Sequence, residues 1–325
     1  MSRSSGGFLT TAKLLLPWVL TAAIFYYLFR KWPIGNVIES LSQARWGLYL
    51  ALMLPYSIAY FMIDTLAVTT AVRRFNAPVR YRDVLPVRAV TYVLALVNSN
   101  VGQGGLALWL YRRNAGPLLS IVGTFVFLAA VEIYQLVIYS SLGVAVVGTA
   151  LPHMGGTYAL LYAVLLGLLL YFNGLRALGV DRPASGVFGT LGRARLSDWG
   201  ILLAIKSVSL LLAIATHWAA LRLFGMQVPF VALVANLPLI FLASAVPLTV
   251  GKLHASLAWA YLLGGYAPPE SLIAYSVASH LTFLVMNALI GVAFLPRTGR
   301  EIWEMAKSPP PRDPTSAAER GGDRA

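Results

Sequence analysis

Four ionisable side chains lie inside or beside long apolar stretches of this sequence. Glu132 lies in FLAAVEIYQLVI, Lys206 in LLAIKSVSLL and Asp64 in FMIDTLA, and Arg88 stands at the start of another apolar run. Charge inside a membrane segment is costly unless it is paired or hydrated, and it commonly marks an ion or substrate pathway. The position of Glu132 therefore predicts either a proton-coupling site or an ion pair with Arg88 or Lys252. Lys206 and Asp64 can also take part in such ion pairs. Structural ion pairing is the alternative for each residue, and Asp64 also suits an interfacial position near a helix end.

Two polar breaks interrupt apolar runs and supply a second set of candidate residues. The first is NSNVGQGG at 98–105, and the second is PLTVGKLH at 247–254. Backbone that leaves a helix inside a bilayer needs polar partners, because lipid offers none, and glycine permits unusual dihedrals and close approach. Helix ends near the midplane also present free N–H groups that suit an anionic headgroup. The predicted substrate-binding residues at these breaks are Asn98, Asn100, Gly102, Gln103, Lys252 and His254.

Each of these residues also has a structural interpretation. The polar side chains can simply cap the tips of two hairpins, and Lys252 can extend along its own stem to an aqueous edge. A metal site at His254 and His280 is disfavoured, because carboxylates are few and the chain has no cysteine. The sequence contains no HExxH, P-loop or GxSxG pattern and no carboxylate cluster. We therefore expect neither an enzyme nor a bound cofactor.

The elements that must position these residues are membrane helices. The chain has 325 residues, of which 58% are hydrophobic and only 11% are charged, a balance outside the range of soluble domains. Membrane segments take up almost the whole length, which leaves no room for a separate soluble catalytic domain. The net charge of +13 lies mostly in short loops and a tail. There it fits the positive-inside bias and contact with anionic lipids better than binding of nucleic acid.

Six stretches predict full spans, because a membrane helix needs roughly 18 to 20 apolar residues. Two further regions, 84–111 and 230–266, contain the polar breaks. The second arm of each is too short to cross the bilayer at about 1.5 Å per residue, so we expect each region to enter the membrane and return as a re-entrant hairpin. The six predicted spans are 12–29, 46–70, 120–147, 158–172, 199–221 and 272–294.

Basic residues orient these segments. Arginines flank the first hairpin on both sides, at 73–82 and 112–113, so both of its ends are expected in the cytoplasm. The flanks of the second hairpin, at 225–228 and 264–269, contain no Lys or Arg, so that hairpin is expected to open to the outside. The loop 30–45 must then also lie outside, although it carries three basic residues.

The two halves of the chain resemble each other. Internal symmetry with interrupted helices at matching places is typical of transporters, whose binding sites lie at the interruptions. Chance similarity between apolar segments is the alternative explanation. Identical residues recur at an offset of 149, the difference between 220 and 71: Ala71 with Ala220, Arg73 with Arg222, Phe75 with Phe224, Val79 with Val228, Val97 with Val246, Val101 with Val250 and Gly102 with Gly251.

These features together predict an all-α polytopic membrane protein, an inverted repeat of two halves with six full spans and two opposed re-entrant helical hairpins. Repeat A covers about 12–150 and repeat B about 157–296, within one membrane domain at 1–307. Residues 308–325 are polar and proline-rich, which predicts a disordered cytoplasmic tail. Both termini are then cytoplasmic, in a bacterial-type inner membrane.

The breaks and their spacing resemble the membrane domain of lysylphosphatidylglycerol synthases and its free-standing, flippase-like relatives. In that family an arginine-led helix runs into a break of the form N-x-x-x-P-x-R-x-G-E, which corresponds here to NSNVGQGGL at 98–106. A second break of the form P-x-x-P-G-G-x-G corresponds to 247–254, and a later G-x-x-P-E corresponds to GYAPPE at 265–270. The resemblance covers roughly residues 45–295.

The motifs depart from the family pattern at several positions. Gln103 stands where the family has arginine, Leu106 where it has glutamate, and Lys252 and His254 where it has small glycines. The resemblance implies this membrane fold and translocation of lipid. The soluble aminoacyl-transfer domain of the synthases has no counterpart in the sequence, so lysylation of lipid is not expected.

Three functions remain open at this point. The first is a transporter or flippase for an amphiphilic, anionic lipid or lipid-linked substrate, with membrane lipids as its partners and the two hairpin tips forming a groove for the headgroup. The second is a small-solute or proton-coupled secondary transporter on the same scaffold. The third is an accessory subunit or enzyme of envelope-lipid biosynthesis, which needs at least two titratable groups within hydrogen-bond reach. Fold analogy does not decide among them.

Overall fold

The computed structural model describes residues 30–97, 99–147, 186–245 and 254–307, together with residues 19, 22–24, 26–28, 163, 166, 167 and 170. Within these residues every regular element is an α-helix. This confirms the all-helical prediction.

Among the described residues, four long helices are apolar enough and long enough to cross a bilayer. They correspond to four of the six predicted spans and confirm a membrane protein with transmembrane helices. The other two predicted spans, 12–29 and 158–172, lie largely outside the described residues. The four helices are α3 (Trp46–Phe75), α6 (Leu118–Val147), α9 (Leu196–Leu223) and α12 (Pro269–Lys307).

Local sequence sets the ends of these helices. Pro78 follows α3 closely, and proline disfavours helix in the residue before it. Gly225, with φ of 77°, follows α9, and this left-handed conformation at a helix C-terminus is accessible to glycine at little cost. At the start of α9, Asp198 accepts a hydrogen bond from the backbone N–H of Arg195 at 2.8 Å, which satisfies one of the free donors of the first turn.

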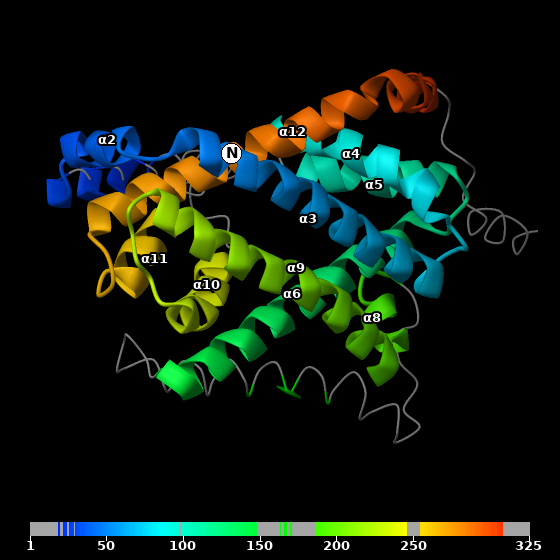
Figure 1. Cartoon of the computed structure of the whole chain (residues 1–325). Coiled ribbons are helices and arrows are strands. Elements are labelled where there is room, and N and C mark those ends of the chain that lie inside the picture. The colour runs from blue at the N-terminus through cyan, green and yellow to red at the C-terminus, as the bar shows by residue number, and fades with distance from the viewer. Residues whose placement is uncertain are drawn as a thin grey trace, which may run out of the picture. The chain divides into compact units, whose positions relative to one another are not determined.

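Two pairs of shorter helices lie between the long ones. In the first pair, α4 (Tyr81–Val97) packs along α5 (Ser99–Arg112), and in the second, α10 (Phe230–Ala245) packs along α11 (His254–Leu263). Figure 1 shows α4 and α5 side by side in cyan. The contact is close, because a Cβ on Gly105 would lie 3.2 Å from Leu94.

The glycine-rich segment of the first break is helical, which differs from the prediction. We expected an unwound stretch at 98–105, but α5 is already helical from Ser99. Gly102, Gly104 and Gly105 therefore lie in its first turns, and none of them has a positive φ. Gly105 lies close to α4, where an added Cβ would be 3.2 Å from Leu94, whereas an added Cβ at Gly104 would meet nothing within 4 Å. The second break, 246–253, lies outside the described residues.

The chain forms two compact units, which do not coincide with the predicted repeats. Each of α3, α6, α9 and α12 contributes residues to both units, so each unit draws on both halves of the sequence. Unit 1 consists of Met1–Tyr56, Ile133–Ala163 and Leu210–Phe283, and unit 2 of Ser57–Glu132, Val164–Ser209 and Leu284–Ala325.

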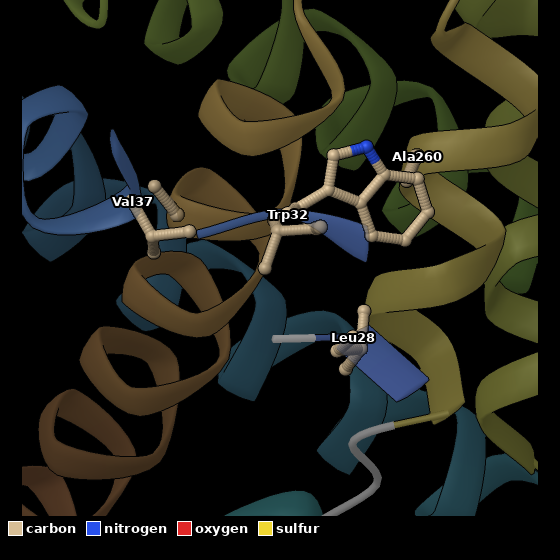
Figure 2. Packing of buried hydrophobic residues seen from close by; sticks show 6 residues of the cluster. Leu28, Trp32, Val37 and Ala260 are labelled. Atoms are coloured by element: carbon tan, nitrogen blue, oxygen red, sulfur yellow. The ribbon is translucent and has the colours of Figure 1, made fainter. Parts of the chain in front are cut away.

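In unit 1 the segment before α3 packs on α11 and α12. Leu28, Trp32 and Val37 are buried with Ala260 of α11 and Ile273 of α12, and Figure 2 shows the indole of Trp32 lying by Ala260. The short helix α2 (Ile34–Ser42) carries Val37. One basic residue of the loop 30–45 takes part in this packing. The Lys31 ammonium lies 4.8 Å from the centre of the Trp32 ring, which is a cation–π contact.

Aromatic side chains join the helices within each unit. In unit 1, Phe224 at the end of α9 meets Tyr49 of α3 and Tyr275 of α12, each with ring centres 5.2 Å apart. In unit 2, Phe127 of α6 meets Phe75 of α3 at 5.2 Å and Trp199 of α9 at 4.8 Å. All four contacts are edge-to-face, the arrangement that aromatic quadrupoles favour.

One glycine in each unit lets two helices touch. In unit 1, Gly143 of α6 lies directly against the backbone of Ala235 in α10. In unit 2, Gly291 of α12 lies against α4, where an added Cβ would be 2.5 Å from the carbonyl oxygen of Ala89 and 2.6 Å from Val93. Neither position has room for a side chain.

Candidate functional site

Four charged side chains, one from each of four helices, meet in the described part of unit 2. Asp64 lies on α3, Arg88 on α4, Glu132 on α6 and Lys206 on α9, and ion pairs link them into one chain. We call these four residues the ion quartet. Three of its helices, α3, α6 and α9, are candidate membrane spans, so the quartet lies among apolar residues.

Asp64 is the centre of the quartet. Its Oδ2 atom accepts a hydrogen bond from Nε of Arg88 at 2.8 Å and lies 2.8 Å from Nη2 of the same guanidinium. The hydroxyl of Tyr92 donates to this oxygen at 3.2 Å. Arg88 and Tyr92 are four residues apart on α4 and therefore share one face of that helix. The Asp64–Arg88 pair is thus held by several bonds at once.

Lys206 connects the two carboxylates. Its Nζ atom lies 3.1 Å from Oε2 of Glu132 and 3.4 Å from Oδ1 of Asp64. The lysine side chain is almost completely buried, with 10% exposed. Two cations and two carboxylates balance in formal charge, which is the condition under which charged groups tolerate an apolar interior.

Glu132 differs from the other three members by its exposure. Its side chain is 48% exposed, whereas those of Asp64, Lys206 and Arg88 are 7%, 10% and 15% exposed. It lies at the edge of the buried face of α6: Leu128 and Leu136, one turn on either side, are both buried. A charged group inside a membrane segment is costly unless it is paired or hydrated, and Lys206 provides the pairing for Glu132.

The quartet therefore has a fixed part and an exchangeable part. Arg88 and Asp64 form a buried, multiply hydrogen-bonded pair that little can reach. Lys206 and Glu132 form a single contact whose carboxylate is open on one side. The ammonium of Lys206 is thus held by both carboxylates of the quartet.

The structure brings together Glu132, Arg88 and Lys206, the three residues that the sequence suggested for coupling or ion pairing. Glu132 pairs with Lys206, although Arg88 and Lys252 were the partners first considered. Lys252 itself lies outside the described residues.

The predicted headgroup residues are only partly described. Gly102 is buried and Gln103 exposed, both in the first turns of α5, and Asn100 is helical. His254 is the first residue of α11, and Asn98 lies outside the described residues. The described structure does not connect these residues with the ion quartet.

Sequence reasoning underestimated Asp64 and missed Tyr92. The predicted span ended at residue 70, which placed Asp64 near the interface, but α3 continues to Phe75. Asp64 is buried and paired with two cations, as the ion-pairing interpretation predicted. Charge balance was a signal in the sequence, because two carboxylates and two cations inside apolar stretches suggest one neutral cluster.

Unit 1 contains a different polar pair, formed by His217 of α9 and Tyr275 of α12. Nδ1 of His217 and the hydroxyl of Tyr275 lie 2.6 Å apart, both buried. Rings of Tyr56, Phe241 and Trp259 surround the imidazole. This pair lacks the charged partners of the ion quartet, so it fits a packing role as the simplest explanation.

Comparisons with protein families, with characterised proteins and with solved structures found no match to this chain.

Proposed function

We propose that this chain is a membrane transporter that moves an amphiphilic, anionic lipid or lipid-linked substrate across the membrane. The observation that carries this proposal is the ion quartet. Four buried or half-buried charges on helices that are otherwise apolar are costly to maintain and are by default functional. A quartet with one open carboxylate suits a protein that handles a charged group inside the membrane.

An anionic amphiphile fits both the polar and the apolar features of unit 2. Lys206 offers an ammonium to a phosphate, which it can bind as a point charge. On α3, the residues Ile58, Met62 and Leu66 follow each other at intervals of four and are all exposed, which gives a continuous apolar stripe. Acyl chains would remain along such stripes while the headgroup moves through the polar interior.

The proposed inverted repeat favours transport, and the two units contain matching pairs of aromatic rings. Phe75 and Phe127 meet in unit 2 as Phe224 and Tyr275 meet in unit 1, with the same separation of ring centres. Phe75 and Phe224 are related by the offset of 149, and Phe127 and Tyr275 by 148, the difference between 275 and 127. Inverted repeats that rock against each other are the usual basis of alternating access.

The close glycine contacts also match between the two halves of the chain. Gly143 on the last helix of repeat A meets α10 of repeat B, and Gly291 on the last helix of repeat B meets α4 of repeat A. The helix pairs α4–α5 and α10–α11 occupy matching places in the two halves. We propose that these pairs are the re-entrant hairpins, and that Asn98, Lys252 and His254 at their tips contact the headgroup.

Reconstitution tests the proposal. Purified protein is placed in vesicles that contain a trace of phosphatidylglycerol with a fluorophore on its acyl chain, and dithionite then destroys the fluorophore in the outer leaflet. We expect the protein to make inner-leaflet phosphatidylglycerol accessible much faster than in protein-free vesicles. Phosphatidylcholine with the same fluorophore should exchange more slowly. If neither lipid exchanges faster than in protein-free vesicles, the proposed function is wrong.

A small-solute transporter coupled to protons is the second candidate, and the exposure of Glu132 favours it. A carboxylate that is open to a polar space and paired with a lysine is suited to carry a proton. Uptake of inorganic phosphate into the same vesicles separates this candidate from lipid transport. Phosphate uptake without lipid exchange would favour the second candidate over the first.

A further inference from the structure

We propose that Glu132 and Lys206 form a proton-gated anion site, in which protonation of Glu132 releases Lys206 to bind a phosphodiester headgroup. This inference rests on the proposed function and adds to it a coupling ion and a residue for each role. It starts from the geometry of one ion pair, in which an exposed carboxylate holds a buried ammonium at 3.1 Å.

The surroundings of Glu132 explain why this pair, and not another, can switch. Lys206 of α9 faces Glu132 directly. Behind Lys206 lie Asp64 of α3 and Arg88 and Tyr92 of α4, which bind one another through Oδ2 of Asp64. Asp64 keeps its two cations whether or not Glu132 is charged. Only Glu132 can exchange a proton with the space beside it, because it alone is half exposed.

Charge counting gives the stoichiometry. The quartet is neutral when Glu132 is ionised, because two carboxylates match Arg88 and Lys206. One proton on Glu132 leaves the quartet with a single positive charge. One phosphodiester carries a single negative charge and restores neutrality. We therefore infer that one proton and one anionic headgroup occupy the site together, and that their movement is electrically neutral.

Dicyclohexylcarbodiimide tests the proton site without any need for transport. This apolar reagent adds to protonated carboxyl groups within membrane proteins, and the product is found by peptide mass spectrometry. We expect labelling of Glu132 to rise several-fold as the pH of the nanodisc sample is lowered, and Asp64 to remain unlabelled. Glu132→Gln should abolish this label, whereas Glu39→Gln, at an exposed position of α2, should leave it unchanged.

The anion is tested in the same experiment. Phosphatidylglycerol nanodiscs should give several-fold more labelling of Glu132 at neutral pH than phosphatidylcholine nanodiscs, since a bound phosphodiester favours the protonated state. Inorganic phosphate added to phosphatidylcholine nanodiscs distinguishes a free anion from a lipid. If inorganic phosphate raises the labelling and phosphatidylglycerol does not, a lipid ligand is excluded.

Transport provides a separate measurement. A proton gradient across the vesicles should accelerate phosphatidylglycerol exchange by the wild-type protein, and Glu132→Gln should lose this response. Glu132→Asp keeps a carboxyl group and should retain part of it. A gradient response that survives in Glu132→Gln, or labelling of Glu132 that does not change with pH, would overturn the proposal. Absence of lipid exchange in every variant would instead count against the proposed function, while the labelling still decides the proton site.

Discussion

At the scale of single residues, Asp64 determines whether the ion quartet is stable. It is bound by Arg88 at 2.8 Å and by Lys206 at 3.4 Å, so its loss leaves two buried cations with Glu132 as their only carboxylate in the quartet. Removing one partner of a buried ion pair typically costs about 3–5 kcal/mol. We predict that Asp64→Asn lowers the free energy of unfolding by an amount of this order, which thermal unfolding in detergent will report as a reduced melting temperature.

Two further variants give the controls for Asp64. Asp83→Asn makes the same chemical change at an exposed position in the first turn of α4 and should change the melting temperature little. The double variant Asp64→Asn with Lys206→Met restores charge balance between Arg88 and Glu132, so it should recover part of the lost stability. A double variant that is less stable than the sum of its single changes would contradict the charge-balance argument.

Lys252 carries a prediction that comes from the sequence alone. It lies beside Gly251 in an apolar run, where an ammonium either binds an anion or reaches an aqueous edge. We predict that Lys252→Met reduces exchange of phosphatidylglycerol more than that of phosphatidylcholine while the protein stays folded, and that Lys252→Arg retains part of the activity. Equal lipid exchange in the methionine variant and the wild type would remove Lys252 from the headgroup site.

At the scale of helices, the two glycine contacts predict matched effects on stability. A Cβ at Gly143 would overlap the backbone of Ala235, and a Cβ at Gly291 would lie 2.5 Å from the carbonyl oxygen of Ala89. Overpacking of this kind costs about 1–3 kcal/mol. We predict that Gly143→Ala and Gly291→Ala both lower the melting temperature, because both force two helices apart.

Gly47 and Gly200 provide matched controls for these contacts. Gly47 is the second residue of α3 and Gly200 is the fifth residue of α9, and an added Cβ at either position meets nothing within 4 Å. Alanine there should leave stability unchanged or raise it by roughly 0.5–1 kcal/mol, because glycine is the poorer helix former. If all four alanine variants behave alike, close helix contact is not the reason for glycine at positions 143 and 291.

Helices and their apolar character were predictable from the sequence, whereas their boundaries and partners were not. Apolar length alone located α3, α6, α9 and α12, because a span needs a minimum run of apolar residues. The glycine-rich run at 98–105 was expected to unwind, yet α5 begins at Ser99. Glycine has low helix propensity in isolation, but this run is helical and packs along α4.

The ion quartet could be predicted in its members but not in its pairing. Burial cost identified Glu132, Lys206 and Arg88 as residues that need partners. Which partner each has depends on helix rotation and on how helices from distant parts of the chain come together, as the pairing of Glu132 on α6 with Lys206 on α9 shows. Those contacts are tertiary, so residue types alone do not specify them.

At the scale of the whole molecule, the proposed repeat makes a prediction about topology. The turns that follow α5 and α11 occupy matching places in the two halves, and both expose residues, Arg113 in the first and Pro268 in the second. In an inverted repeat these two turns face opposite sides of the membrane, and in a parallel repeat they face the same side. Because basic residues lie at 112–113, we expect the first turn in the cytoplasm.

Single cysteines test this topology directly, because the chain has no cysteine of its own. Arg113→Cys, Pro268→Cys and Lys307→Cys are each treated in intact cells with a maleimide that does not cross the membrane. We predict that Pro268→Cys is labelled in intact cells, and that Arg113→Cys and Lys307→Cys are labelled only after the membrane is opened. Opening the membrane is also the control, since it shows that each cysteine can react at all. Labelling of Arg113→Cys and Pro268→Cys from the same side would exclude the inverted arrangement, and with it the symmetry on which alternating access of the two halves depends.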